Sequence, residues 1–224
     1  MKTYEQANEL ATSMIDIGKQ LGRDVKAEIT SMNKPLGRAI GNKNEILEVV
    51  ETLQGNGPAD FVELITSASA TILLQSKIFT TEEEAIEAVG RVISNGEALE
   101  KFKVWIKAQG GDVDSIFKED FLKPKYNVEV KAEKKGFLEI TSAVAFGITA
   151  MKLGAGRESK GDALDNDAGI YLNKKTNEEV NEGDVIFTLS SSNEIATSLV
   201  NDLKNAYNIN DKTVENKIIL GKLG

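Results

Sequence analysis

The groups best suited to chemistry in this sequence are backbone oxygens in a glycine-rich loop and a carboxylate that follows it. The loop covers residues 33–42, reads NKPLGRAIGN, follows an expected strand and leads into an expected helix at residues 44–53. Carbonyls that converge in such a loop, with a carboxylate from the helix, suit a hard cation. The alternative is an ordinary strand-to-helix turn. The glycine spacing matches neither a Walker phosphate loop nor a dinucleotide fingerprint.

Few residue types are available for catalysis, because the 224 residues include no histidine and no cysteine. Without cysteine there are no disulfides, thiolate metal sites or thiol nucleophiles, which suits a reducing compartment. Without histidine the chain lacks the usual general base at neutral pH and the commonest metal ligand. Lysine, arginine, carboxylates, hydroxyls and backbone groups remain. We therefore expect no self-contained catalytic centre in this chain.

The charge distribution restricts the possible partners. A formal net charge of -8 argues against nucleic acid, because phosphate backbones are bound by concentrated basic faces. The first residues, MKTYEQANEL, lack a basic segment followed by an apolar one, and no apolar run approaches the length of a membrane span. The sequence predicts a cytoplasmic protein that binds neither nucleic acid nor membrane.

Lys152 lies in a motif that has two readings. Ala150-Met-Lys152 resembles the tip on which carrier domains bear biotin, and the surrounding β-rich segment, with Val180-Asn-Glu-Gly-Asp184, fits a carrier-like barrel. A modified lysine must stand on a tight hairpin, whereas Lys152 ends an apolar run with helical spacing. A motif without its structural context is usually chance. We therefore expect Lys152 to be unmodified.

Two other charged features have structural readings. The acidic stretch 162–167 superficially resembles a calcium loop but lacks the required glycine and terminal glutamate, so we interpret it as solvated surface. Arg157 follows Gly154-Ala-Gly156, where it could bind an anion or pair with a carboxylate of its own fold.

Hydrophobic spacing predicts a first part rich in helices. Apolar residues at three- and four-residue intervals predict a helix at residues 4–21 whose buried face includes Leu10, Met14 and Ile17. Alternation of apolar and polar residues predicts a strand at residues 24–31. A helix opened by Pro58 should bury a further stripe, and two more helices follow it. The members of that stripe are Phe61, Leu64, Ile65, Ala68 and Ile72.

The pattern changes after Pro124, where short alternating segments predict a β-rich section. Strands are expected at residues 169–172 and 185–189, a short apolar helix at 143–153, and a last helix at 194–206 before a final strand near residues 218–220. The sequence therefore predicts an α/β protein with a boundary near residue 122, giving domains at 1–122 and 123–224.

Several of these segments, in this order and spacing, resemble one family, the pyrimidine-nucleoside phosphorylases, which include thymidine phosphorylase. Each motif alone is weak, but the ordered set is specific and covers nearly the whole chain. The matching segments are Met14-Ile-Asp-Ile-Gly-Lys19, Met32-Asn-Lys-Pro-Leu-Gly-Arg-Ala-Ile-Gly-Asn42, Glu51-Thr-Leu53, Gly55-Asn-Gly-Pro58, Ala108-Gln-Gly-Gly-Asp112 and Gly154-Ala-Gly-Arg157 with Lys160, Asp162 and Asp165.

The resemblance implies a fold and a position within a larger enzyme. The chain resembles the downstream half only: the downstream part of a mixed-sheet α/β domain with a helical middle, then an α+β domain resembling a barrel-sandwich (biotinyl- or lipoyl-like) fold. The family's histidine-containing phosphate signature and its pyrimidine-binding residues would lie upstream. The lack of histidine agrees with this reading. Departures from the family at 174–178 and 166–167 concern the C-terminal domain.

The resemblance also implies a reaction, a pentosyl transfer that belongs to nucleoside salvage. Phosphate attacks C1′ of a pyrimidine nucleoside and gives the free base and an α-pentose 1-phosphate. Members of the family are homodimers and need no organic cofactor. Because the phosphate- and pyrimidine-binding residues have no counterpart here, we expect the isolated chain to be inactive. The alternative is a noncatalytic scaffold or carrier-like binding module.

One family feature transfers residue by residue. The resemblance implies a potassium site whose ligands in the downstream half are two backbone carbonyls of the Pro-Leu-Gly-x-Ala motif and a helical glutamate. These positions are Leu36, Ala39 and Glu48. The remaining ligands would come from the upstream half, so the site in this chain is incomplete.

Overall fold

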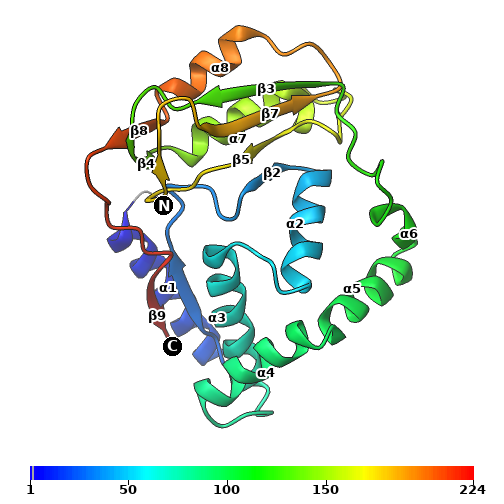
Figure 1. The fold of residues 1–224 in the computed structure, drawn as a ribbon. Coiled ribbons are helices and arrows are strands. Elements are labelled where there is room, and N and C mark those ends of the chain that lie inside the picture. Colours follow the sequence, from blue (N-terminus) through cyan, green and yellow to red (C-terminus); the bar gives the residue numbers. More distant parts are fainter. Residues whose placement is uncertain (2) are drawn as a thin grey trace.

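A computed structural model describes residues 1 and 3–224 and shows an α/β protein (Figure 1). A β-rich part made by the second half of the chain lies at one end, and the helices of the first half extend away from it. Every strand pairing among the described residues is antiparallel. The mixed sheet that we expected is therefore not formed by these residues.

Helix α1 (Tyr4–Gln20) begins where Thr3 caps it, the Thr3 hydroxyl accepting the Gln6 N–H at 3.3 Å. The helix is present as predicted, but its buried face is not the predicted one. Ile15 and Gly18 are buried, and Gly18 lies so close to Val25 that a Cβ there would clash. The expected stripe, Leu10, Met14 and Ile17, is exposed. The prediction was wrong because the neighbours that this stripe would need are absent from the described residues.

Strand β1 (Ala27–Thr30) pairs with β9 (Ile219–Leu223), so the two ends of the chain meet in a two-stranded sheet. Helix α1 covers one face of this sheet. Helix α3 (Ala59–Gln75) lies on the other face, where the Ser67 hydroxyl donates to the Glu28 carboxylate at 2.6 Å. Both faces are therefore covered by helices.

The middle of the chain is helical, as expected. Helices α2 (Lys43–Leu53), α3, α4 (Glu82–Ser94), α5 (Glu97–Ala108) and α6 (Val113–Ile116) follow one another. The α3 stripe that we predicted is only partly correct: Ser67 and Ala70 are buried, and Ala68 and Ile72 are exposed. Helix α3 packs on α4, and the buried residues of the two helices are small: Ser67 and Ala70 on α3, and Ala85, Ala88 and Val89 on α4.

The β-rich part holds two sheets. One has the order β2-β5-β7-β3 and the other β6-β4-β8. The strands are β2 (Ala39–Gly41), β3 (Tyr126–Lys131), β4 (Gly136–Ile140), β5 (Gly169–Leu172), β6 (Glu179–Val180), β7 (Val185–Ser191) and β8 (Tyr207–Asn210). Strand β2 lies inside the segment that we predicted as a loop, and β8 was not expected. Because β2 joins this sheet, the segment at 39–41 packs with the C-terminal part. The division at residue 122 stays a prediction.

These two sheets enclose the main core, together with α7 (Ala143–Ala150), a π-helical turn η1 (Met151–Ala155) and α8 (Thr197–Lys204). Phe146 and Phe187 meet edge to face at the centre, with ring centroids 4.9 Å apart. All fully buried members of this cluster lie between Val130 and Ile209. The core of the second half is thus complete within the chain.

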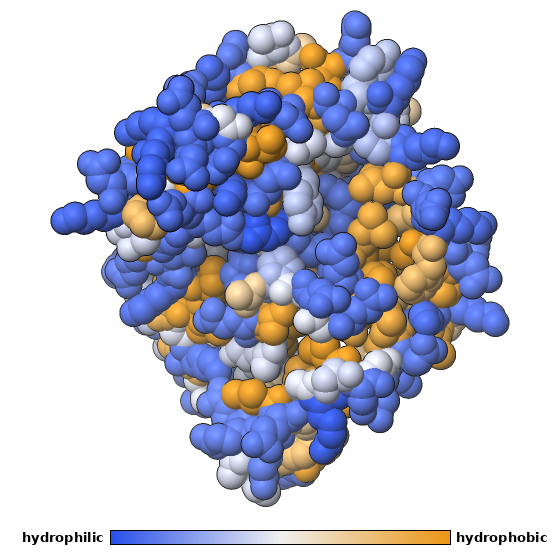
Figure 2. Space-filling view, in the orientation of Figure 1, coloured by the Kyte–Doolittle hydropathy of each residue, from blue (hydrophilic) through white to orange (hydrophobic). Residues whose placement is uncertain are grey.

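The first half buries much less. Figure 2 shows apolar residues at the surface on the right-hand side of the molecule, below the β-rich part. Among the large side chains that stay exposed are Ile72, Ile78, Val104 and Trp105. Within the described part of the chain, none of the helices has the length and apolar character needed to span a bilayer.

Candidate functional site

The glycine-rich loop turns sharply between β1 and α2 and ends as strand β2. Gly37 has a φ of +67°, a left-handed conformation that favours glycine. A Cβ at this position would lie 2.1 Å from Oε2 of Glu48. The loop therefore lies directly against the Glu48 carboxylate, and a larger residue at position 37 would have to displace that carboxylate.

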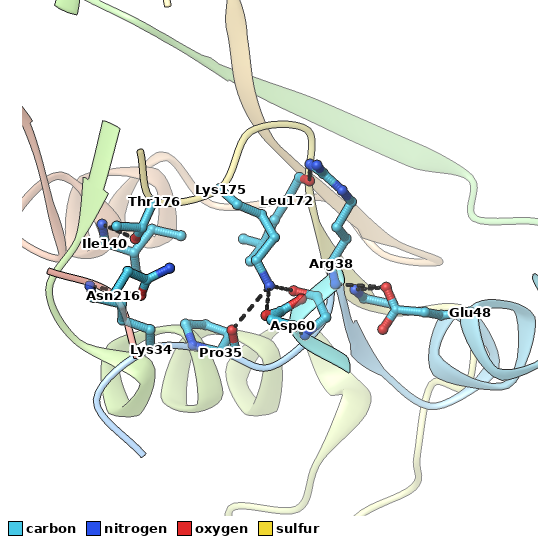
Figure 3. A network of polar contacts seen from close by, with 12 residues as sticks. Lys34, Pro35, Arg38, Glu48, Asp60, Ile140, Leu172, Lys175, Thr176 and Asn216 are labelled. Atoms are coloured by element: carbon cyan, nitrogen blue, oxygen red, sulfur yellow. Dashed lines mark hydrogen bonds and ion pairs between the residues drawn. The ribbon is translucent and has the colours of Figure 1, made fainter. Parts of the chain in front are cut away.

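Glu48 lies on α2 and points into the loop (Figure 3). It is 8% exposed, and its Oε1 accepts the backbone N–H of Arg38 at 2.6 Å and of Ala39 at 3.1 Å. Burial raises the pKa of this carboxyl, and the two N–H donors only partly oppose the shift. A desolvated carboxylate with one oxygen engaged by the backbone would be stabilised by a nearby cation.

Glu48 contacts the backbone of strand β2 at its first residue, Ala39. Residues of an extended strand alternate in the direction of their backbone groups. Leu172 N–H donates to the Arg38 carbonyl at 2.8 Å, so Arg38 directs its carbonyl towards β5. The N–H groups of both Arg38 and Ala39 donate to Glu48. The structure thus brings the Ala39 N–H to Glu48, whereas the role of the Ala39 carbonyl as an ion ligand stays a prediction.

Leu36 lies three residues earlier, before the turn at Gly37. Its side chain is partly exposed, and within the described residues no hydrogen bond reaches its carbonyl oxygen. The carbonyl is therefore free to bind a ligand, although its placement with Ala39 and Glu48 as a third ligand stays a prediction.

Lys175 and Asp60 complete the surroundings of the loop, and sequence reasoning missed both. The Lys175 ammonium donates to the carbonyls of Pro35 and Gly37 and forms an ion pair with Asp60. The same Asp60 oxygen accepts the Gly37 N–H at 3.2 Å. Burial lowers the pKa of Lys175, and Asp60 opposes this shift. A positive charge thus already lies against one face of the loop.

Sequence offered weak signals for these two residues. Asp60 lies in the first turn of α3, where a carboxylate is commonly found because it interacts favourably with the helix dipole. Lys175 follows Lys174 in a polar segment, where lysines are usually exposed to solvent. The separation of 115 residues hides their relationship. The second oxygen of Asp60, Oδ1, is buried without a hydrogen-bond partner among the described residues.

Arg38 anchors the loop to the β-rich part. Its guanidinium donates to the carbonyls of Leu172 and Asn173, each at 3.1 Å, and forms an ion pair with Glu178. Arg38 and Lys175 therefore hold the two sides of the turn at Gly37 against the β5–β6 connection. Such fixation keeps backbone oxygens in place without a metal.

The donor set suits a monovalent hard cation held by few charges. Groups of three or more acidic, histidine or cysteine side chains able to hold a metal ion do not occur among residues 1 and 3–224. A potassium ion does not need such a group, because backbone carbonyls and one carboxylate supply oxygen ligands. Glu48 is buried, and among the described residues it forms no ion pair with a lysine or an arginine, whereas Glu178 and Asp60 do. The residues present thus fit a cation of low charge.

The motifs at Lys152 and Arg157 make contacts within the chain's own fold. Lys152 lies in η1, not on a hairpin between strands, and its ammonium pairs with Asp202 at 3.0 Å. Arg157 donates from Nε to the Asp162 carbonyl at 3.0 Å, so it binds its own loop.

The acidic stretch is less solvated than we interpreted it to be. Asp165 is partly buried and accepts the Ser192 N–H at 2.6 Å and the Ser191 hydroxyl at 3.1 Å. Asp167 pairs with Lys43 at 3.0 Å and accepts the Lys123 N–H. These carboxylates connect segments distant in sequence, so the solvated reading was wrong for both.

Comparison with known proteins identifies relatives over the whole chain. Residues 137–210 match the family model described as the pyrimidine nucleoside phosphorylase C-terminal domain. A thymidine phosphorylase of Metamycoplasma hominis is 44% identical over all of this chain and 82% of the relative. Pyrimidine-nucleoside phosphorylases of Staphylococcus haemolyticus and Staphylococcus aureus are 39% and 40% identical over 93% and 98% of the chain. The match covers 48% and 51% of these two relatives, so the chain spans about half their length.

Proposed function

This chain belongs to the pyrimidine-nucleoside phosphorylase family and corresponds to its C-terminal portion, and from this premise we propose that it is the downstream part of an enzyme that cleaves pyrimidine nucleosides with phosphate. The observation that carries the proposal is the 44% identity to a thymidine phosphorylase over the full chain. The substrates are a pyrimidine nucleoside and inorganic phosphate, and the products are the base and an α-pentose 1-phosphate.

The reaction makes two demands on the complete enzyme. Phosphate attacks C1′ as the bond to the base breaks, so the sugar becomes oxocarbenium-like and the departing pyrimidine gains negative charge. Fixed donors must stabilise that charge. Phosphate and nucleoside must also be held together in one orientation. We propose that the groups meeting these demands lie in the upstream portion and that this chain alone does not turn over substrate.

The role of this chain is to present the loop at residues 33–42. Leu36 and Ala39, through their carbonyls, and Glu48, through its carboxylate, would hold a potassium ion. When bound, that ion supplies a fixed positive charge to the site. Two other residues hold the loop in place. Lys175 donates to the carbonyls of Pro35 and Gly37, and Arg38 donates to the carbonyls of Leu172 and Asn173. The ion binds in the loop conformation that these contacts maintain.

We extend the proposal to the rest of the family pattern. The C-terminal domain, with two antiparallel sheets around one core, would be a barrel-sandwich fold of the biotinyl or lipoyl kind without a modified lysine. The complete enzyme would be a cytoplasmic homodimer that functions in nucleoside salvage and uses no organic cofactor.

A phosphorolysis assay tests the proposal. The purified chain is incubated with phosphate and either uridine or thymidine, and release of the base is measured, alone and with the separately expressed upstream half of the Staphylococcus aureus relative. We expect no turnover alone and measurable turnover from the mixture. Turnover by the chain alone would contradict the inactivity that we propose.

The alternative function is a noncatalytic scaffold, favoured by the large apolar side chains that the first half leaves exposed. A mixture in which the two halves bind each other but never release base supports that alternative.

A further inference from the structure

The Lys175 ammonium lies among three oxygen atoms, and Figure 3 shows it pointing towards Pro35 and Asp60. It donates to the Pro35 carbonyl at 3.4 Å and to the Gly37 carbonyl, and it forms an ion pair with Oδ2 of Asp60. An ammonium group has three N–H donors and no acceptor. The three oxygens therefore match its donors one to one, and we call these oxygens the ammonium cage.

The cage is shielded from water. No other ion pair between described residues encloses both of its partners to the extent that Lys175 and Asp60 are enclosed. Gly37 is buried as well, and within the described part of the chain its carbonyl and that of Pro35 accept no backbone N–H. A buried carbonyl without a donor is costly. Lys175 is thus the donor that satisfies both carbonyls.

The cage joins three segments that are distant in sequence. Pro35 and Gly37 belong to the glycine-rich loop, Asp60 to the first turn of α3, and Lys175 to the β5–β6 connection. Oδ2 of Asp60 also accepts the Gly37 N–H at 3.2 Å. The ammonium is therefore a common contact through which the β-rich part holds both the loop and α3.

The backbone that carries Lys175 is held independently of its ammonium. The N–H groups of Lys174 and Asn177 donate to carbonyls of β7 and β4, at 3.1 and 2.8 Å. The hydroxyl of Thr176, a buried residue, accepts a further N–H of β4 at 3.1 Å. The core thus fixes the turn that would have to move to fill the cage. We therefore expect a shorter side chain at position 175 to leave the cage open.

We propose that the ammonium cage is a binding site for a primary ammonium ion, which Lys175 fills with its own side chain, and that Lys175 is thereby a positioning residue for the loop at residues 33–42. The loop takes its shape from this tethered cation and needs no dissolved ion to do so. Because Lys175 engages the carbonyls on either side of Leu36, the Leu36 carbonyl is the one of the three that it leaves open. This inference goes beyond the proposed function, because it needs neither phosphate nor nucleoside.

Chemical rescue tests this proposal. Lys175→Ala removes the atoms from Cγ to Nζ, which are those of propylammonium. The melting temperature of this variant should be about 3 °C or more higher in propylammonium chloride than in tetramethylammonium chloride at equal ionic strength, because only propylammonium has N–H donors for the cage. In the parent chain the two salts should agree within about 1 °C, because the cage is already filled.

Two variants serve as controls. Lys174→Ala removes the neighbouring lysine, whose ammonium donates to the Glu179 carbonyl at an exposed contact, and it should respond equally to the two salts. Lys175→Ala combined with Asp60→Asn keeps the two carbonyls but removes the negative charge of the cage. The difference between the salts should then fall by about half or more, because hydrogen bonds to a charged acceptor are the stronger ones.

A measurement on the parent chain does not depend on the stability of any variant. With each N–H bound to an oxygen, the Lys175 ammonium protons should exchange slowly with water and give a resolved nitrogen–proton correlation signal at neutral pH. The signal should disappear in Lys175→Arg, because a guanidinium is a planar fork of five donors and has no nitrogen with three.

Three results would each overturn the proposal. They are equal melting temperatures of Lys175→Ala in the two salts, an equally large propylammonium effect in Lys174→Ala, and the lack of a slowly exchanging Lys175 ammonium signal in the parent. The last decides the matter even if Lys175→Ala does not fold. A chain that passes these tests but releases no base with the upstream half keeps the ammonium cage and contradicts the proposed function, so the two failures are distinguishable.

Discussion

Lys175 and Asp60 form a largely enclosed ion pair across the loop at residues 33–42, with side chains 14% and 13% exposed. The pair joins the β5–β6 connection to the first turn of α3, and both partners also bind Gly37, through its carbonyl and its N–H. This charge pair therefore fixes the loop backbone together with Arg38 and Glu48. The position of the loop carbonyls therefore depends on two residues that lie outside the loop.

Replacing Lys175 should destabilise the protein strongly. Lys175→Met leaves the Asp60 carboxylate buried without its cation, and the free energy of unfolding should fall by about 3 kcal/mol. Urea denaturation measures this change. Lys174→Met is the matched control, because Lys174 only donates to the Glu179 carbonyl at an exposed contact, and it should cost less than about 0.5 kcal/mol.

A second substitution, at Asp60, distinguishes the cost of a buried unpaired charge from the cost of lost packing. Adding Asp60→Asn to Lys175→Met removes the buried charge and keeps an acceptor for the Gly37 N–H. We expect the double variant to recover part of the stability. A double variant as unstable as the sum of its parts would show that the two residues do not interact.

Potassium should stabilise the complex of this chain with the upstream half through Glu48. An ion that binds only the folded state raises the melting temperature, so potassium chloride should raise it above the value in choline chloride at equal ionic strength. Glu48→Gln should abolish the difference, because the amide carries no charge. Glu51→Gln changes an exposed carboxylate of the same helix and should retain it. An equal potassium effect in all three proteins would remove Glu48 from the site.

The pH dependence of Glu48 gives an independent measurement. Burial raises its pKa in the folded state, so the folded protein binds this proton more tightly than the unfolded chain does. The protonated carboxyl contributes its whole stabilisation to the free energy of unfolding below the ordinary glutamate pKa of about 4.3. This stabilisation is lost as the pH rises through the higher pKa of the folded state. In choline buffer Glu48→Gln should therefore be more stable than the parent at pH 7, and this advantage should shrink towards pH 4. An advantage that grows in acid would reverse the sign and contradict the burial argument.

Gly37 and Gly22 allow a test of the contact between loop and carboxylate. Both have a φ of +67°, but a Cβ at Gly22 meets no atom within 4 Å, whereas one at Gly37 lies 2.1 Å from Glu48 Oε2. Gly22→Ala should cost about 1 kcal/mol for the left-handed backbone alone. Gly37→Ala should cost clearly more in the same denaturation experiment. Equal costs would mean that Glu48 does not press on the loop.

Asp165 should stabilise the β-rich part by its hydrogen bonds. Desolvation acts to raise the pKa of this carboxyl, but the Ser192 N–H and hydroxyl, with Asp167 N–H and the Ser191 hydroxyl, outweigh it and lower the pKa. Its contribution is therefore present above the ordinary aspartate pKa of about 3.9 and is lost as pH falls through the lower folded value. Asp165→Asn should reduce stability at pH 7 by about 1–2 kcal/mol, with a smaller loss in strong acid. Asp211→Asn, at an exposed position, is the control.

The spacing of apolar residues in the sequence predicted many of the helices and strands of the fold. Most helices and the strands β5 and β7 lie close to their predicted positions, because the period of apolar residues reflects the geometry of each element. The family followed from ordered motifs, which need no knowledge of the third dimension. The glycine-rich loop was located in the same way, and Glu48 accepts the Ala39 N–H across it, while ion binding by the loop stays a prediction.

Other features depended on the tertiary structure. The spacing of Leu10, Met14 and Ile17 correctly predicted a helix, but these three side chains are exposed and not buried. Burial requires a neighbouring segment, and an apolar pattern does not show which segment provides it. Strand β2 formed from a loop-like segment because β5 offered it backbone partners.

The sequence by itself thus determined the family, most of the helices and strands, and the position of the glycine-rich loop. Only the tertiary structure showed that Lys175 and Asp60 hold this loop and that one face of α1 stays open. The physical reason is that helix and strand periods are local, whereas an ion pair across 115 residues exists only after the chain has closed on itself.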